Sequence, residues 1–121
     1  MYIKRFKPNL RGRDFVCGDI HGSMSCVEQF LLGVDFDTNH DRLFCAGDLI
    51  DRGPRNEECI DLLYEPWFHM CKGNHELLME QYFTGHPQGV WWGPNGGGWG
   101  LHYESEMSDM GLDRKSTRLN S

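Results

Sequence analysis

Three short motifs bounded by glycine, each directly after a run of apolar residues, constrain the fold more than any other feature of the chain. They are GDIHG at residues 18–22, GDLIDRG at residues 47–53 and GNHE at residues 73–76. Asp19, Asp48 and Asn74 stand 29 and 26 residues apart, and a strand–helix–strand unit needs about 30 residues. Because ligand sites in parallel sheets form at the carboxyl ends of the strands, we expect the three motifs to converge there in an α/β fold.

The residues between the motifs predict the strands and helices that carry them. Short apolar runs predict strands at residues 14–17, 42–46 and 67–71. Helical spacing predicts a first helix capped by Ser23 and closed by Gly33, with Met24, Val27, Phe30, Leu31 and Val34 packed in the core. A second helix is expected to begin at Pro54, and a third to cover residues 76–83 with Leu77, Leu78 and Tyr82 inward. This βαβαβα order predicts a parallel sheet with right-handed crossovers and helices on both faces.

The segment 86–100, HPQGVWWGPNGGGWG, is rich in glycine, proline and tryptophan and shows no regular period. Leaving three tryptophans in water is unfavourable, so we interpret the segment as an ordered aromatic loop. Packing of this loop over the sheet edge is the favoured interpretation, and contact with a substrate is the alternative. A further short helix is expected at residues 107–110.

Length, charge and cysteine content narrow the class of protein. A chain of 121 residues with a net charge of −6 is expected to form one domain, and its acidity argues against nonspecific nucleic-acid binding. The sequence has neither an apolar run of membrane-spanning length nor the apolar part of a secretion signal, so we expect a cytoplasmic location and no membrane partner. The five cysteines are odd in number and form no CxxC motif, and we interpret Cys17, Cys45 and Cys71 as small buried strand residues rather than metal ligands.

Metal-binding groups follow the three predicted strands. Asp19, His21, Asp48 and Asn74 offer mixed oxygen and nitrogen ligands, which suit Mn²⁺, Fe²⁺ or Zn²⁺ better than Ca²⁺. Two metals about 3.5–4 Å apart form a clamp for displacement at phosphorus. Such a clamp needs a bridging anionic ligand, and we expect Asp48 to be that bridge because it is central in the sequence.

Neighbouring residues fit phosphoryl transfer. Arg52 can hold phosphate oxygens bidentately, and His75, beside Asn74, can protonate the departing oxygen as a general acid. Asp51 can orient the imidazole of His75. In the alternative interpretations, Asp51 and Arg52 form an ordinary surface pair, and Glu76 stabilises the N-terminus of its helix.

The motifs GDIHG, GDLIDRG and GNHE resemble the signature of the phosphoprotein phosphatase branch of the calcineurin-like metallophosphoesterases, and more closely the lambda-phage-type enzymes of bacteria and phages. The stretches at residues 65–68 (EPWF) and 95–99 (NGGGW) resemble further parts of that group. The resemblance covers about residues 14–102 and implies the N-terminal βαβαβα half of a metallophosphoesterase sandwich. It implies a serine/threonine protein phosphatase with two divalent metals, usually Mn²⁺, and phosphoprotein or phosphopeptide substrates.

The resemblance also assigns roles to single residues. Asp19 and His21 would bind the first metal, Asp48 would bridge, and Asn74 would bind the second. Arg52 would contact phosphate, and the Asp51–His75 pair would serve acid catalysis.

The chain departs from the family pattern after residue 102. Two further histidine ligands and a second arginine of the family are not recognisable, and neither His86 nor His102 is expected to replace them. His40 and His69 are interpreted as a turn residue and a strand residue. Residues 113–121, DRKSTRLNS, resemble the translation of a sequencing adapter. We therefore expect a partial metallophosphoesterase domain at residues 1–112, an artefactual tail, and little turnover.

Two alternative functions remain. A dinucleoside tetraphosphate hydrolase uses similar motifs, but its central motif usually has alanine where this chain has Asp51, and it has GNHD where this chain has GNHE. The second alternative, from another class, is a non-catalytic metal-binding fragment that holds metal weakly. Assays on a phosphopeptide and on diadenosine tetraphosphate separate these interpretations.

Overall fold

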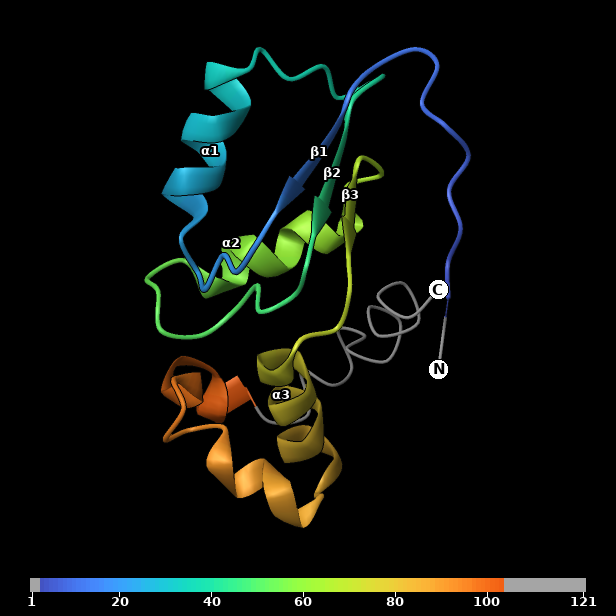
Figure 1. Ribbon diagram of the computed structural model, residues 1–121. Helices are drawn as coiled ribbons and strands as arrows, with labels where there is room; N and C mark the ends of the chain where they lie inside the picture. Colours follow the sequence, from blue (N-terminus) through green and yellow to red (C-terminus); the bar gives the residue numbers. More distant parts are fainter. Residues whose placement is uncertain (1–2, 104–121) are drawn as a thin grey trace.

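The computed structural model describes residues 3–103, and strands alternate with helices along this part of the chain (Figure 1). The strands are β1 (Asp14–Cys17), β2 (Arg42–Cys45) and β3 (Phe68–Met70), and the α-helices are α1 (Met24–Gly33), α2 (Asn56–Asp61) and α3 (Asn74–Thr84). Three 3₁₀ helices follow α2 and α3: η1 (Leu62–Tyr64), η2 (Pro87–Trp91) and η3 (Gly97–Tyr103). The predicted βαβαβα order is confirmed. The helix expected at residues 107–110 and the tail at 113–121 lie outside the described residues.

The three strands form one parallel sheet in the order β1-β2-β3. Phe15 of β1 pairs with Leu43 of β2, which pairs in turn with Phe68 of β3. Two positions further along, Cys17, Cys45 and Met70 stand in the same register. All three strands therefore end at the same edge, as the motif spacing predicted.

The expectation of helices on both faces of the sheet is wrong for the described residues. Leu43, Cys45, Phe68 and Met70 are buried on one face, where Phe15 packs edge-on against Phe30 of α1. Helices α1 and α2 contact each other, and buried residues of both belong to this core. The strands are added in one direction, so two right-handed crossovers place both helices on the same side. Helices on both faces require a reversal of strand order, which these three strands do not have.

The opposite face of the sheet carries Val16, Phe44 and His69 in alternate positions. Val16 is 81% exposed, whereas the ring of Phe6 from the N-terminal segment lies 4.9 Å from that of Phe44 and 4.6 Å from that of His69. His69 is thus a strand residue, as predicted, and it packs in an aromatic group rather than in a site. Phe6 shields only the β2 and β3 side of this face.

Several element boundaries differ from the prediction for local reasons. Helix α2 begins at Asn56 rather than Pro54, because Pro54 directly follows a tight turn with positive φ at Asp51 and Arg52. Helix α3 begins at Asn74, two residues early, since the Glu76 side chain accepts the N–H of Gly73 and fixes the first turn. Ser23 stands at the N-cap of α1 but makes no side-chain cap hydrogen bond.

Helix α3 turns Leu78 and Tyr82 toward the core, as the sequence pattern predicts, but the expectation is wrong for Leu77. Leu77 is 43% exposed, whereas His75, Glu76 and Met79 are buried. Two polar residues of the GNHE motif occupy inward positions, and their spacing to Met79 defines the buried stripe. The polar residues of the motif therefore take the buried positions at the start of the helix, and Leu77 is left exposed.

The aromatic segment after α3 is ordered, as predicted, but much of it is helical. Helix η2 packs on α3, and the ring of Trp92 lies 5.4 Å from Tyr82 and 5.5 Å from Phe83. His86 begins this segment, and its ring Nδ1 accepts the backbone N–H of Gln88 at 3.1 Å. The segment therefore extends the core beyond the end of the sheet.

The five cysteines are free thiols. Cys45 and Cys59 are buried, and burial raises the pKa of Cys59 to about 11. Cys71 is exposed, because β3 ends at Met70, so the expectation that it is a buried strand residue is wrong.

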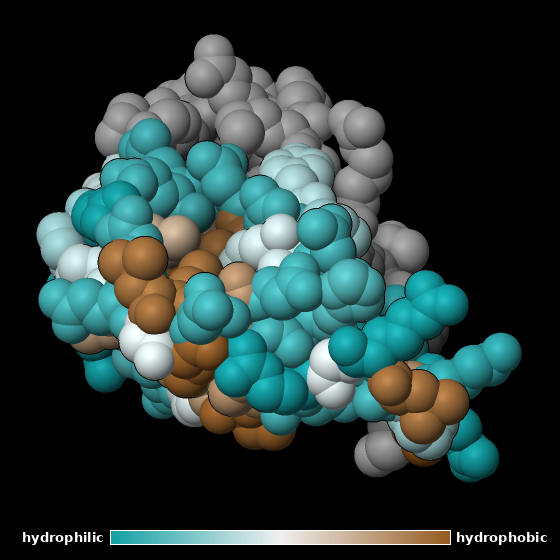
Figure 2. Space-filling view, turned by 90° about the horizontal axis from the view of Figure 1, so that it is seen from above, coloured by the Kyte–Doolittle hydropathy of each residue, from teal (hydrophilic) through white to brown (hydrophobic). Residues whose placement is uncertain are grey.

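Within residues 3–103, no helix is both long enough and apolar enough to cross a membrane. Seen from above, the surface is largely hydrophilic, and hydrophobic groups gather in a band in the left half of the view and in a smaller group at its lower right (Figure 2).

A buried carboxylate joins the N-terminal segment to the loop before β2. Asp41 accepts the backbone N–H of Arg13 at 2.7 Å and that of Asp37 at 2.9 Å, and it forms an ion pair with the Arg13 guanidinium. The hydrogen bond from that guanidinium holds the pKa of Asp41 well below its ordinary value of 3.8. His40, in the same turn, bonds Asp37, as expected of a turn residue.

Replacement of Asp41 with asparagine is expected to lower stability at neutral pH and to leave a flatter stability profile in acid. A carboxylate with a lowered folded-state pKa contributes stability above its unfolded pKa and loses it as pH falls. The wild-type urea midpoint should therefore fall from about pH 5 downward, more steeply than that of D41N. Asp61→Asn, an exposed site on α2, is the matched control, and equal profiles for the two variants would contradict the assignment.

Candidate active site

Backbone hydrogen bonds join the first two motifs at the carboxyl edge of the sheet. The N–H groups of Ile20 and His21 both donate to the carbonyl of Asp48, at 3.1 and 3.0 Å, and Gly22 donates to Leu49 at 2.9 Å. The loops approach so closely that a Cβ at Gly53 would lie 1.9 Å from the His21 carbonyl. Only glycine fits at this position, because any side chain would collide with the His21 carbonyl. The hydrogen bonds join the two loops into one unit.

Strained backbone is concentrated in this unit. His21, Asp48, Asp51 and Arg52 have φ angles of 47°, 54°, 78° and 72°. A non-glycine residue in the left-handed region costs about 1–3 kcal/mol. The surrounding hydrogen bonds therefore hold these four side chains in directions that an unconstrained loop would not favour.

Three of the predicted metal ligands come together. One ligand atom each from Asp19, His21 and Asp48 lie within 4.8 Å of one another. The Nδ1 of His21 lies 2.9 Å from the carbonyl of Ile50 and donates its proton there, which leaves Nε2 free, 3.6 Å from an Asp19 oxygen. Two carboxylates and an oriented imidazole form a donor set suited to a divalent metal of the first transition row.

Asn74, the fourth predicted ligand, is the exposed first residue of α3. Its neighbour His75 donates its backbone N–H to Oδ1 of Asp48 at 3.0 Å. The start of α3 therefore lies against the Asp48 carboxylate, and Asn74 is brought to the same edge as the other three ligands.

Glu76 connects the second and third motifs. Its Oε1 accepts the N–H groups of Asp48 and Gly73 at 2.7 and 2.9 Å, and its Oε2 accepts that of Leu49 at 3.0 Å. Glu76 is 3% exposed, and burial raises its pKa while these backbone donors oppose the shift. Glu76 thus binds the N-terminus of α3, as the alternative interpretation expected, and it also fixes the backbone of Asp48.

Replacement of Glu76 with glutamine is expected to destabilise the fold by about 1–3 kcal/mol, because a buried N–H would lose its acceptor. An amide NH₂ would then face one of the donors that the carboxylate now accepts. Urea unfolding measures the loss of stability. Titration with Mn²⁺ should show weaker binding, because the backbone of Asp48 would be held less firmly by residue 76. Glu58→Gln, at an exposed pair with Arg55, is the control. An E76Q midpoint equal to that of the control would refute the connecting role.

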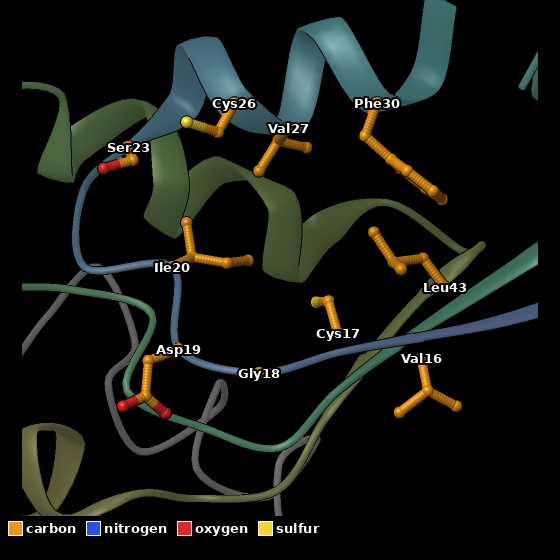
Figure 3. Close-up of a pocket in the computed structure, with 10 residues that line it drawn as sticks. All are labelled: Val16, Cys17, Gly18, Asp19, Ile20, Ser23, Cys26, Val27, Phe30 and Leu43. Atoms are coloured by element: carbon orange, nitrogen blue, oxygen red, sulfur yellow. The ribbon is translucent and has the colours of Figure 1, made fainter. Parts of the chain in front are cut away.

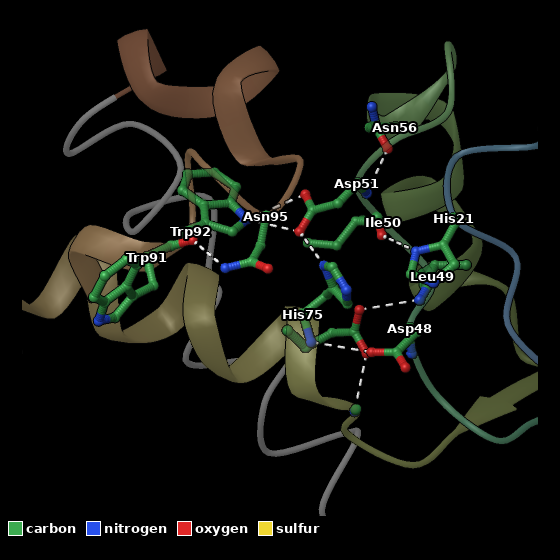
Figure 4. Close-up of polar contacts among 12 residues, drawn as sticks. His21, Asp48, Leu49, Ile50, Asp51, Asn56, His75, Trp91, Trp92 and Asn95 are labelled. Carbon is green, nitrogen blue, oxygen red and sulfur yellow. Dashed lines mark hydrogen bonds and ion pairs between the residues drawn. The ribbon is translucent and has the colours of Figure 1, made fainter. Parts of the chain in front are cut away.

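The predicted Asp51–His75 pair is formed. The Nδ1 of His75 lies 2.8 Å from Oδ2 of Asp51, and both side chains are buried (Figure 4). The His75 ring packs edge-on against that of His21 at 4.7 Å, so it borders the metal-ligand cluster. The buried amide of Asn56 accepts the N–H of Asp51 at 2.7 Å and holds the turn from behind. The interpretation of Asp51 and Arg52 as a surface pair is wrong, because Asp51 is fully buried.

Two tryptophans of the aromatic segment also bind Asp51, and the sequence did not reveal them as site residues. The indole Nε1 of Trp92 donates to the Asp51 carboxylate at 2.9 Å, and that of Trp99 donates at 2.7 Å. Trp92 points toward Asp51, whereas its neighbour Trp91 points away (Figure 4). The sequence offered two signals, the tryptophan-rich segment 86–100 and the NGGGW stretch within it, and neither indicated a contact with Asp51.

Arg52 is exposed at the rim of the site. Its backbone N–H donates to the carbonyl of Gly96 at 3.4 Å. Within the part of the chain that the structure describes, its guanidinium makes no hydrogen bond or ion pair. The charged group is thus available to an anion at the same edge.

A cavity of about 340 Å³ opens between β1 and α1 beside the metal-ligand cluster (Figure 3). Asp19 lies at its border, and Cys17, Ile20, Val27, Phe30 and Leu43 point toward its interior (Figure 3). Such a lining suits an apolar group. The predicted metal ligands His21 and Asp48 do not line this cavity.

A family model described as calcineurin-like phosphoesterase matches residues 15–111, which include all three motifs. The chain belongs to this family. Serine/threonine-protein phosphatase 2 of Escherichia coli K12 is 41% identical over 100 residues, which are 82% of this chain and 45% of that protein. Serine/threonine-protein phosphatase 1 of Salmonella typhimurium is 42% identical over 85 residues, 70% of this chain and 39% of that protein. The chain thus spans less than half the length of these metallophosphoesterase relatives.

Tetraphosphatases are also similar to this chain. The symmetrical bis(5'-nucleosyl)-tetraphosphatase of Yersinia enterocolitica is 34% identical over 73 residues, 59% of this chain and 25% of that protein. A crystal structure described as a candidate diadenosine tetraphosphatase superposes with a TM-score of 0.58 at 30% identity. It covers 73% of this chain and 38% of the other. This neighbour confirms the metallophosphoesterase arrangement of parallel strands and flanking helices.

Proposed function

We propose that this chain carries part of the catalytic centre of a two-metal serine/threonine protein phosphatase. One observation carries the proposal: the buried Asp51–His75 pair borders a cluster of metal-binding groups. A carboxylate that orients an imidazole beside bound phosphate is suited to proton transfer onto a leaving oxygen. The phosphatase relatives support the same reaction.

Four residues would hold the metals. Asp19 and His21 would bind one ion, Asn74 the other, and Asp48 would bridge them. Mn²⁺ is the proposed ion, with Fe²⁺ and Zn²⁺ as alternatives that the mixed oxygen and nitrogen donors also suit. When bound, two such ions supply positive charge that stabilises the transferring phosphoryl group.

The remaining side chains act on the phosphate ester directly. Arg52, exposed at the rim of the site, would bind two phosphate oxygens. The Nδ1–H of His75 donates the hydrogen bond to Asp51. Nε2 is therefore the atom that would carry a proton to the seryl or threonyl oxygen as the ester bond breaks. Asp51 would hold the ring in that orientation and stabilise its positive charge.

A dinucleoside tetraphosphatase is the second candidate, because such enzymes are among the relatives. Asp51 argues against it. The tetraphosphatase motif usually has alanine at this position, whereas here Asp51 is buried and pairs with His75. The higher identity to phosphatases over a larger share of the chain supports the same choice.

Mn²⁺-dependent turnover by the purified 121-residue chain tests the proposal. At micromolar protein we expect slow release of phosphate from a phosphoserine peptide, and none from diadenosine tetraphosphate. A preference for the tetraphosphate would replace the proposal with the second candidate. Mn²⁺ binding in calorimetry without turnover of either substrate would identify a non-catalytic metal-binding fragment. Rapid hydrolysis would contradict the expectation that the site is incomplete.

We further propose a cytoplasmic location in a bacterial or phage-infected host and phosphoproteins as partners, without nucleic acid or membrane. The acidic composition and the bacterial relatives support these assignments. Fractionation of a producing cell, followed by detection of the chain, tests the location.

A further inference from the structure

The Asp51 carboxylate is the meeting point of two parts of the chain that lie far apart in sequence. It is 0% exposed and accepts hydrogen bonds from the Nδ1 of His75 and from the indoles of Trp92 and Trp99. An indole N–H can only donate, and an ionised carboxylate can only accept. Three donors therefore surround one acceptor group, and Asp51 cannot rotate without losing at least one of them.

Glycines 96, 97 and 100 allow the aromatic segment to approach this carboxylate. A Cβ at Gly96 would lie 2.8 Å from Cγ of Arg52 and 3.2 Å from Cβ of Asp51. A Cβ at Gly97 would lie 2.4 Å from the Trp92 ring, and one at Gly100 would lie 2.5 Å from it. The carbonyl of Gly96 also accepts the N–H of Arg52, inside the strained turn.

We propose that Trp92 and Trp99 are positioning residues of the catalytic site. They fix the carboxylate of Asp51 through their indole N–H groups and so fix the ring of His75 and the turn that carries Arg52. This role deepens the proposed function and rests on it. The NGGGW stretch would then serve the catalytic site through Trp99, in addition to packing.

The chemistry of the donors explains why tryptophan is needed rather than another aromatic residue. Phenylalanine fills a similar apolar space but offers no N–H. With both indoles in place, the carboxylate accepts the hydrogen bond from Nδ1–H of His75 in one orientation, and Nε2 faces away from Asp51. Without them, Asp51 has free acceptor sites and can turn, and the imidazole loses its fixed direction.

The four indole N–H signals of the ¹⁵N-labelled chain test the contact independently of turnover. Each signal is assigned from the matching tryptophan-to-phenylalanine variant. In Asp51→Asn, we expect the Trp92 and Trp99 signals to shift strongly toward those of free indole, while the Trp67 and Trp91 signals stay in place. Unmoved Trp92 and Trp99 signals would overturn the proposal. If D51N fails to fold, the Trp92 and Trp99 signals in His75→Asn give the same decision, because loss of the third donor changes the Asp51 carboxylate that both indoles bind.

Leaving-group dependence tests the positioning role. A general acid matters most for a poor leaving group, so W99F should lower kcat about tenfold on a phosphoserine peptide and less than about threefold on p-nitrophenyl phosphate. Equal losses on both substrates would show a structural role only and would overturn the proposal. Trp91→Phe, at a neighbouring exposed site, should leave both rates unchanged.

The two arms separate the proposals. If the wild-type chain turns over neither substrate, the proposed function fails, while the indole signals still decide whether the two tryptophans hold Asp51. If turnover occurs but the Trp92 and Trp99 signals do not shift in D51N, the positioning role fails and the proposed function stands.

Discussion

Replacement of Asp48 with asparagine is expected to abolish Mn²⁺-dependent turnover while leaving the fold intact. The introduced amide would keep a side-chain oxygen that can accept the N–H of His75, which Oδ1 of Asp48 now accepts at 3.0 Å. The variant would lose the negative charge that a bridging ligand must supply. Metal ions contribute several kcal/mol of transition-state stabilisation, so we expect kcat to fall at least about a thousandfold. Calorimetric titration with Mn²⁺ should show a parallel loss of affinity, and circular dichroism should stay unchanged.

Asp35→Asn is the matched control for this variant. Asp35 has a φ angle of 50°, close to the 54° of Asp48, and it is exposed. The substitution changes the charge and the strained backbone in the same way, away from the three motifs. Near-normal turnover in D48N, or an equal loss in D35N, would refute the assignment of Asp48 as the bridging ligand.

The sequence predicted the carboxyl-edge cluster correctly because each part of it is local. An apolar run, a glycine and a metal-binding side chain follow one another within a few residues, and parallel strands bring such ends together. Asp19, His21 and Asp48 meet for this reason. The pairing of Asp51 with His75 was predicted because Asp51 stands three residues past Asp48, and the family resemblance implied the same pair.

The contacts that the sequence did not predict join distant parts of the chain. Trp99 reaches Asp51 across 48 positions, and Glu76 reaches Asp48 across 28. Neither contact leaves a periodic signal in the sequence, because each depends on how segments beyond the ends of the strands pack against one another. The same reason explains Leu77, whose exposure follows from buried polar partners in its own helix.

Replacement of His75 with asparagine is expected to lower kcat on a phosphoserine peptide by about 10²–10⁴-fold, the usual contribution of a general acid. The loss on p-nitrophenyl phosphate should be much smaller, because its leaving oxygen departs without a proton. Rates of phosphate release at saturating Mn²⁺ measure both effects. His40→Asn, in a surface turn, should change neither rate. Equal losses on the two substrates would show that His75 acts on binding or metal retention rather than on proton transfer.

The double variant Asp51→Asn, His75→Asn distinguishes a carboxylate that acts through the imidazole from one that acts alone. Asp51 contacts His75 at 2.8 Å and is fully buried, so it reaches the reacting phosphate only through that ring. Residues that act as a unit are not additive. The double variant should therefore be about as slow as H75N alone on the phosphoserine peptide. If the two losses multiply instead, Asp51 has a second effect, and its hydrogen bonds with Trp92 and Trp99 are where that effect would lie.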